Sequence, residues 1–311
     1  MKNIIQIFRS IKIFVPIAAC LFMASSCDDI DDTKRVTIGN MEEYKIEGDN
    51  ITVEVDGQSF TYTDLHRILI EDFTGWRCVN CPNMAAFLTN NIENIFPSVV
   101  VSLHPASNSL SNTDQVASRF SLSCTLADEI ANTLAGTTIA SSMSLPAVSL
   151  DQKAINGQIL QSGDTMTVYN TLRSLSFDQF SSYYVNHAPF VNLAINVKKS
   201  SDNNYLLSTL LVPGAYINKD VKLQLWLLES GIVAYQSTQS GINREYVNNH
   251  VLRMAINGNQ GEVFKIGDDY VMMSHTLSLE GTSYVADNCS VVAIISDPNT
   301  NEVINCVEVD L

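Results

Sequence analysis

The chain has 311 residues, which corresponds to about two domains, and 46% of them are apolar, which argues against global disorder. Its 33 acidic and 18 basic residues give a formal net charge of −15. This charge argues against nucleic acid as the main partner, because phosphate binding needs a basic surface. The seven cysteines are too few for a disulfide-scaffolded miniprotein and contain one CxxC, which argues against a paired-CxxC zinc site.

Residues 1–26 have the pattern of a secretory signal peptide. They carry three basic side chains and no acidic one, and an apolar run extends from about residue 13 to residue 24. A permanent membrane-spanning helix needs roughly 20 apolar residues, so this run is too short for one. It is typical of the apolar region of an export signal, and we predict that residues 1–26 are removed.

The end of this segment predicts a lipid anchor. Residues 23–27 are Met-Ala-Ser-Ser-Cys, and small residues before a cysteine resemble a bacterial lipobox, in which Cys27 becomes the lipidated first residue. A similar pattern precedes Cys20, but cleavage there would truncate the apolar run, so we favour Cys27. Acyl chains at Cys27 would bind a membrane that the protein does not span. Removal of the three basic residues would change the net charge from −15 to −18.

Residues 27–50 are polar and acidic, which predicts a solvated tether. Four aspartates follow Cys27 closely: Asp28, Asp29, Asp31 and Asp32. An acidic run in this place resembles the surface-export signal of Bacteroidota lipoproteins, whereas an aspartate there favours inner-membrane retention in enterobacteria. We expect a lipid anchor in the outer membrane, with the protein either at the cell surface or facing the periplasm.

Residues 51–188 have the element order of an α/β domain. The expected elements are a hairpin over 51–63, strands over 67–73 and 98–104 with a helix over 82–95 between them, one or two helices over 113–134, a strand over 143–151 and a helix over 167–184. An Asp-Gly turn predicts the hairpin. The continuous apolar runs are typical of strands buried on both faces, and strand, helix and strand at this spacing form a βαβ unit.

Residues 189–311 have period-two patterning instead. The expected strands are 191–198, 205–212, 221–227, 232–236, 263–266, 274–279, 290–295 and 303–309. Many short alternating strands with turn signals between them predict an all-β sandwich. We therefore expect an α/β domain over 51–188 followed by a β-sandwich domain over 189–311.

The main chemical motif is Cys78-Val79-Asn80-Cys81, which lies between a predicted buried strand and a predicted helix. This is the context of a thioredoxin-type redox motif. We expect Cys78 at the helix N-terminus, where free N–H groups and the helix dipole stabilise a thiolate, with Arg77 adding a positive charge. Cys81, in the first turn, would be the resolving thiol.

Two further residues fit the same chemistry. Asp72 precedes Cys78 by six residues, a spacing that resembles the buried acid of thioredoxins, which accepts a proton from the second cysteine. Glu71 competes for this role, and a solvated strand-end carboxylate is the alternative. Pro146 precedes a predicted strand where thioredoxin folds carry a cis-proline loop. We expect a cis bond between Leu145 and Pro146 that faces the cysteine pair.

Three features together resemble one family: Phe73-Thr-Gly-x-x-Cys-x-x-Cys-Pro82, the lipobox, and Asn249-His-Val-Leu-Arg253 in the β-rich part. They resemble the Bacteroidota outer-membrane lipoprotein family of roughly 28-kDa members, and the resemblance implies a thioredoxin-like domain joined to a β-sandwich but no settled activity. One departure is that Trp76 precedes Arg77 here, whereas the family pattern places an aromatic directly before the first cysteine.

The remaining candidates have structural interpretations beside functional ones. Cys289 and Cys306 flank a predicted hairpin and could form a structural disulfide, depending on the strand register. Cys124 is then expected as a buried free thiol. His104 ends a strand on the side where ligands gather in α/β sheets, although it could simply cap that strand. The five histidines do not pair at metal-ligand spacing, and we expect no metal or cofactor.

Two functions are consistent with these patterns. The first is thiol–disulfide exchange on a protein substrate, with Cys78 and Cys81 exchanging electrons, Asp72 carrying the proton and Pro146 shaping the groove. Arg77, Trp76 and His104 would support this site. The second is a redox-inactive surface lipoprotein that binds a ligand through its β-sandwich and keeps the pair as a structural disulfide. The sequence leaves open whether the protein is an enzyme.

Overall fold

The computed structural model describes residues 50–63, 65–112, 121–155, 158–159, 177–184, 191–213, 218–267 and 269–311. The predicted signal peptide, Cys20, Cys27 and nearly all of the predicted tether lie outside the described residues. Among the helices that are described, none has the length and apolar character needed to cross a membrane.

The first half of the chain contains strands interleaved with helices. Its elements are β1 (Asn50–Val55), β2 (Gln58–Thr63), β3 (Ile68–Phe73), α2 (Cys81–Leu88), the π-helical turn η3 (Thr89–Glu93), β4 (Ser98–Leu103), α3 (Thr125–Ala135), β5 (Ala147–Leu150), β6 (Ala154–Ile155), β7 (Gln158–Ile159) and α4 (Phe177–Tyr184). β3 pairs in parallel with β4 and antiparallel with β5. The predicted βαβ unit is therefore present as β3, α2 and β4, and the β1–β2 hairpin turns at Asp56 and Gly57 as expected.

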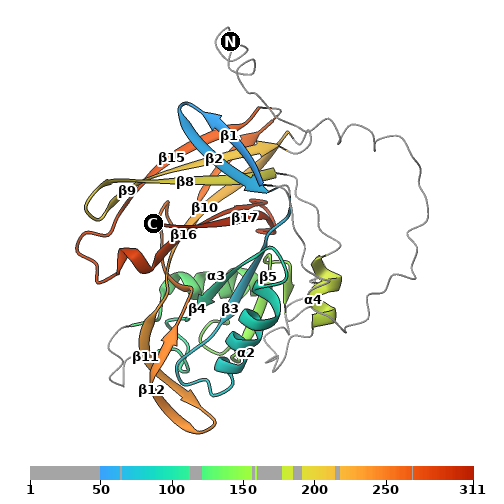
Figure 1. Cartoon of the computed structure of the whole chain (residues 1–311). Coiled ribbons are helices and arrows are strands. Elements are labelled where there is room, and N and C mark those ends of the chain that lie inside the picture. Colours follow the sequence, from blue (N-terminus) through green and yellow to red (C-terminus); the bar gives the residue numbers. More distant parts are fainter. Residues whose placement is uncertain are drawn as a thin grey trace.

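Helices cover both faces of β3, β4 and β5 (Figure 1). All six residues of β3 are buried, because successive side chains point to opposite faces and a core covers each face. Ile68 and Ile70 join a core with α2 and α4, whereas Leu69 and Phe73 join a second core with α3. This explains why the strand is apolar except for two acidic residues.

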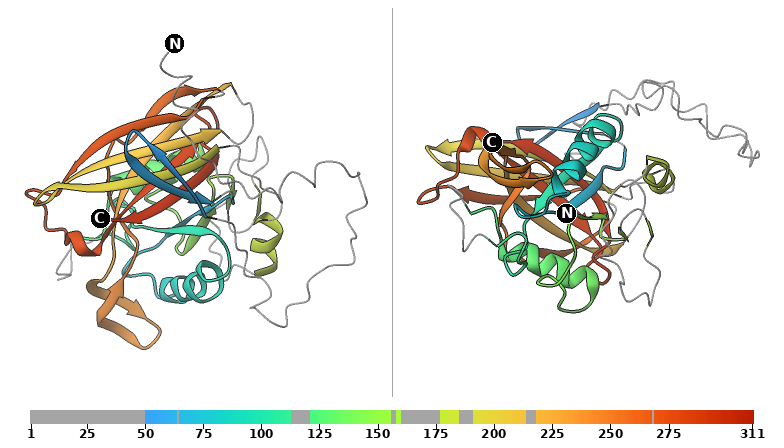
Figure 2. Two further views of the ribbon diagram at one scale, coloured as in Figure 1. Left: turned by 45° about the horizontal axis from the view of Figure 1, so that its top comes forward. Right: turned by 90° about the horizontal axis from the view of Figure 1, so that it is seen from below.

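The second half of the chain consists almost entirely of strands. They are β8 (Val191–Ser201), β9 (Asn204–Pro213), β10 (Lys219–Glu229), β11 (Ile232–Thr238), β12 (Gly241–Asn248), β13 (Val251–Ala255), β14 (Glu262–Ile266), β15 (Val271–Ser278), β16 (Cys289–Ser296) and β17 (Val303–Asp310), with a 3₁₀ turn η4 at Ala286–Asn288. β8, β9 and β15 form one sheet, which lies over β10, β14, β16 and β17 (Figure 2). Alternate side chains of both sheets form a shared apolar core, so the predicted sandwich-like packing is confirmed.

Strands from both halves of the chain share a sheet. Its order is β17-β16-β10-β13-β4-β3-β5-β6-β7, and β13 lies parallel to β4. Trp226 and Leu228 of β10 belong to the same core as Leu69 and Phe73 of β3. A boundary near residue 188 would thus separate two parts of the chain that share hydrogen bonds and a common core. The boundary itself stays a prediction.

Several predicted elements differ in length from the observed ones. Of the one or two helices expected over 113–134, α3 is observed, and residues 113–120 lie outside the described part of the chain. Cys124, which precedes it, has an extended backbone. The helix expected over 167–184 is described only from Phe177. β12 was not predicted, because most of its side chains are exposed and its sequence lacks period-two apolar alternation.

The disulfide that Cys289 and Cys306 could have formed, depending on the register, is absent. Both thiols are free, as is that of Cys124, which is half-buried and not fully buried as expected. In the β16–β17 ladder Cys306 lies opposite Ile294, five residues from Cys289 along β16. The two side chains also belong to different apolar cores, on opposite faces of the sheet. The register thus separates two thiols that the hairpin alone could have brought together.

Candidate functional site

The CxxC loop connects the end of β3 to the start of α2. Cys78 and Cys81 form a disulfide with a Cα–Cα distance of 5.4 Å. α2 begins at Cys81, with Pro82 next to it and Asn80 as the N-cap residue. Cys78 therefore lies in the turn before the helix and not at its N-terminus, which corrects the expected position. The Cys78 N–H donates to the carbonyl of Gly75, and the Cys81 N–H donates to the carbonyl of Cys78.

A neighbouring loop supports the CxxC loop from one side. The Arg77 N–H donates to the carbonyl of Leu110 over 2.9 Å. A Cβ atom at Gly75 would lie only 2.5 Å from that same carbonyl oxygen. Gly75 is therefore required by the close approach of two backbone segments, which explains the glycine of the Phe-Thr-Gly motif.

The hairpin formed by β11 and β12 contacts the CxxC loop from the other side. The side-chain amide of Gln236 donates to the carbonyls of Gly75 and Cys78 over 3.2 and 3.0 Å. The N–H of Ser237 donates to the carbonyl of Trp76 over 2.6 Å. Sequence reasoning missed this contact, because nothing local to Gln236 indicates a partner about 160 residues away. Both cysteines are buried, at 4% and 2% exposure.

Trp76 and Arg77 interact with each other and with the neighbouring loop. The indole N–H of Trp76 donates to the carbonyl of Asn112. The guanidinium of Arg77 lies 4.6 Å from the centre of the Trp76 ring and donates to the carbonyl of Ser109. The positive charge of Arg77 is thus directed to the indole ring and to a carbonyl, an arrangement typical of cation–π pairing.

Asp72 lies beside the motif in a buried position. It lines a hollow of about 310 Å³ together with Thr74 and Pro82, and its Oδ1 atom has no hydrogen-bond partner among the described residues. Burial raises the pKa of Asp72 to about 7. Glu71 points to the other face of β3, where it accepts a hydrogen bond from Gln152. The alternative of a solvated strand-end carboxylate is wrong, because Asp72 is only 1% exposed.

His104 lines the same hollow, across from α2. Burial lowers the pKa of His104 to about 4, and the charge of Arg253 adds to this effect. The imidazole is therefore neutral near neutral pH, and its Nδ1 atom has no partner among the described residues. Tyr246, Asn248 and His250, from β12 and the turn after it, also line the hollow.

Pro146 precedes β5, and the Leu145–Pro146 bond is cis, as expected. The next residue, Ala147, pairs with Phe73 at the end of β3, immediately before the Phe-Thr-Gly-CxxC segment. Leu145 and Ala147 share a core with both cysteines. The proline loop thus adjoins the CxxC loop through strand pairing and a common core.

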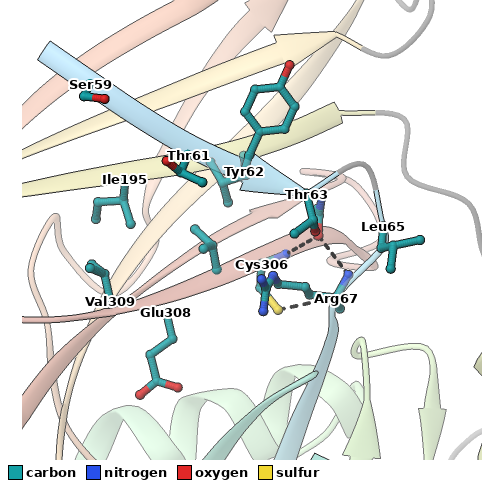
Figure 3. Close-up of a pocket in the computed structure, with 13 residues that line it drawn as sticks. Ser59, Thr61, Tyr62, Thr63, Leu65, Arg67, Ile195, Cys306, Glu308 and Val309 are labelled. Carbon is teal, nitrogen blue, oxygen red and sulfur yellow. Dashed lines mark hydrogen bonds between the residues drawn. The ribbon is translucent and has the colours of Figure 1, made fainter. Parts of the chain in front are cut away.

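A second hollow of about 310 Å³ lies away from the cysteine pair, between β2, β8 and β17 (Figure 3). Ser59, Thr61 and Thr63 contribute hydroxyl groups to it, and the Cys306 thiol donates to the carbonyl of Arg67 at its edge. Burial raises the pKa of Cys306 well above its usual value, which disfavours the thiolate form. Within the described part of the chain, no cluster of three metal-binding side chains exists.

The Asn249–Arg253 segment joins the β-rich half to β4. The carbonyl of His250 accepts a hydrogen bond from Ser102 N–H in β4. Arg253 forms a buried ion pair with Glu229 over 3.0 Å and stacks on Tyr284. These residues, which the sequence marked as a motif, have structural roles at the junction of the two halves.

Comparison with known proteins places the chain in a family. The model of the outer membrane protein Omp28 family matches residues 149–311. The chain belongs to the Omp28 family. This confirms the family inferred from the sequence motifs, and membership assigns the protein to the outer membrane.

Two solved structures are similar to this Omp28-family chain. HBP35 of Porphyromonas gingivalis is 14% identical, with a TM-score of 0.56, and the match covers 80% of this chain and 76% of that one. This shows a shared fold. A domain of the outer membrane lipoprotein Omp28 from the same organism is 25% identical over 40% of this chain and 88% of its own, with a TM-score of 0.29. Among curated proteins, none matches this chain.

Proposed function

We propose that this Omp28-family protein is a lipid-anchored thiol–disulfide exchange protein with a thioredoxin-like domain. The observation that carries the proposal is the position of the Cys78–Cys81 disulfide, between β3 and α2 of a βαβ unit. The cis-proline before β5 and the buried Asp72 are the two further groups that such chemistry uses. The domain division near residue 188 and the lipid at Cys27 belong to the same proposal.

The exchange proceeds through a mixed disulfide. A thiolate of a dithiol substrate attacks Cys78 Sγ, which forms a bond to the substrate and breaks the bond to Cys81. Cys81 leaves as a thiolate. The second substrate thiolate then attacks the substrate sulfur of the mixed disulfide and releases Cys78. Two electrons pass from the substrate to the cysteine pair, and the substrate leaves as a disulfide.

Asp72 supplies the proton that Cys81 needs when it leaves. A carboxyl with a pKa of about 7 is partly protonated near neutral pH and can both give and recover a proton there. Glu71 has a similar pKa of about 7 but accepts a hydrogen bond from Gln152, whereas Asp72 Oδ1 has no hydrogen-bond partner among the described residues. This difference favours Asp72 for the role.

A structural disulfide is the second candidate, and the burial of both cysteines favours it. A substrate cannot reach sulfur atoms that are this covered unless the surroundings move. In that case the protein would act as a binding lipoprotein, and its β-sandwich would carry the ligand contacts.

The reduction potential of the pair decides between these candidates. The mature protein in detergent would be equilibrated with glutathione buffers and its thiols trapped and counted. A potential between roughly −120 and −270 mV is that of known exchange proteins and supports exchange. A value below about −300 mV is typical of structural disulfides and contradicts it.

A further inference from the structure

The hairpin of β11 and β12 stands apart from the large sheet. Its strands, which follow β10 and precede β13 in the chain, pair with each other as a separate two-stranded sheet (Figure 1). The turn and most of β12 are exposed, including Ile242 at 57%. Its apolar anchorage is a small cluster of four residues: Leu122, Ile232, Ala234 and Val251. Little apolar burial therefore holds this hairpin in place.

Its polar contacts are concentrated on the CxxC loop. Three hydrogen bonds reach the consecutive stretch from Gly75 to Cys78, two from the Gln236 amide and one from Ser237 N–H. Gln236 is only 2% exposed, although it lies on an otherwise accessible hairpin. The strand register shifts between Ala234 and Gln236, and such an irregularity can redirect a side chain.

We propose that the β11–β12 hairpin covers the Cys78–Cys81 pair and that Gln236 is the positioning residue that holds this cover on the CxxC loop. A thiol reaches Cys78 Sγ only after the hairpin moves and these hydrogen bonds break. The biological meaning of the cover rests on the proposed exchange function. The cover itself is a property of the fold and is testable without a known substrate.

The test is the rate at which dithiothreitol reduces the disulfide in the full mature chain. Gln236→Met keeps the side-chain volume and removes both amide donors. Each lost hydrogen bond weakens the closed state, so we expect reduction to accelerate by roughly tenfold or more. The reduction potential should stay unchanged, because these hydrogen bonds reach backbone carbonyls of the loop and not the sulfur atoms. A merely structural residue would not raise the rate at constant potential.

Gln224→Met is the matched control. Gln224 is also buried in a strand, but its amide donates to Asn259, outside the CxxC loop. We expect the wild-type reduction rate for it. If Gln236→Met does not fold, Gln236→Asn replaces it, because the shorter amide cannot reach both carbonyls. Equal rates in the wild type and the folded Gln236 variant would overturn the proposal.

The two proposals fail in different ways. A potential below about −300 mV together with faster reduction of Gln236→Met would support the proposed cover and contradict the proposed exchange function. A potential in the exchange range with no change in the reduction rate would contradict the proposed cover and support the proposed exchange function.

Discussion

At the scale of single residues, Asp72 and Glu71 are adjacent buried acids with opposite surroundings. One lines the hollow beside α2 and the other accepts a hydrogen bond from Gln152 on the far face of β3. A strand separates neighbours in this way because its side chains alternate. The pair therefore offers one candidate proton carrier and one matched control in the same strand.

Both acids should make the stability of the protein depend on pH. Burial raises the pKa of each to about 7, whereas the unfolded chain holds them near their ordinary values of about 4. Between these values the folded state binds more protons, so the free energy of unfolding falls as pH rises through this interval. Asp72→Asn and Glu71→Gln should each stabilise the protein more at pH 8 than at pH 4, by roughly 2–4 kcal/mol. Urea unfolding at both pH values measures the difference, and equal effects would contradict it.

Only one of these substitutions should alter the exchange chemistry. Asp72→Asn removes the proton donor, so we expect the reduction rate of the Cys78–Cys81 pair to lose its dependence on pH around 7. Glu71→Gln should keep the wild-type profile. Stopped-flow reduction across this pH range distinguishes them, and identical profiles for both variants would remove Asp72 from the mechanism.

Asp151 is a structural counterpart of these acids. Its carboxylate accepts hydrogen bonds from His66 over 2.7 Å, from Tyr183 over 3.0 Å and from the N–H of Leu69. Asp151→Ala would remove the acceptor shared by these three buried donors, and we expect a loss of about 3–5 kcal/mol in urea unfolding. Asp202→Ala is the control, because that carboxylate is fully exposed and its ion pair with Lys199 contributes little. A loss under about 1 kcal/mol for Asp151→Ala would contradict the buried role.

At the scale of elements, the CxxC loop forms hydrogen bonds with two other segments of the chain. One is the loop around Leu110 and the other is the β11–β12 hairpin. Neither segment adjoins the motif in sequence. The local arrangement of strand, turn and helix is encoded near the cysteines, but the two supports arise from the tertiary fold.

Gly75 provides a test of this arrangement. In Gly75→Ala the new methyl group would meet the Leu110 carbonyl at 2.5 Å, so one of the two loops must shift. We expect a loss of about 1–3 kcal/mol in unfolding free energy and faster reduction of the disulfide. Gly267→Ala is the control, since its Cβ would enter open space without a positive φ. An unchanged stability of Gly75→Ala would show that the close approach is not required.

At the scale of the whole molecule, the chain belongs to an outer membrane protein family, and its residues 23–27 resemble a lipobox. We predict that Cys27 carries the lipid. Labelled palmitate should enter the wild type and Cys20→Ala, but not Cys27→Ala. Incorporation that persists in Cys27→Ala and is lost in Cys20→Ala would assign the lipid to the other cysteine.

The sequence by itself determined the features that depend on local pattern. Alternation, turn residues and apolar runs identified the β1–β2 hairpin, the βαβ unit and most strands of the sandwich, because these elements bury one face or both. The motifs likewise indicated the Omp28 family, which the family model confirms. The Cys78–Cys81 pair and the cis bond at Pro146 followed from residue type and local context.

Only the tertiary structure decided what depends on register and on distant contacts. It separated Cys289 from Cys306, because the register of the β16–β17 pair places the two side chains on opposite faces of the sheet. It joined strands of both halves into one sheet, and it brought Gln236 onto the CxxC loop. Such contacts join residues far apart in the chain, and their energy comes from packing and hydrogen bonds that no local pattern records.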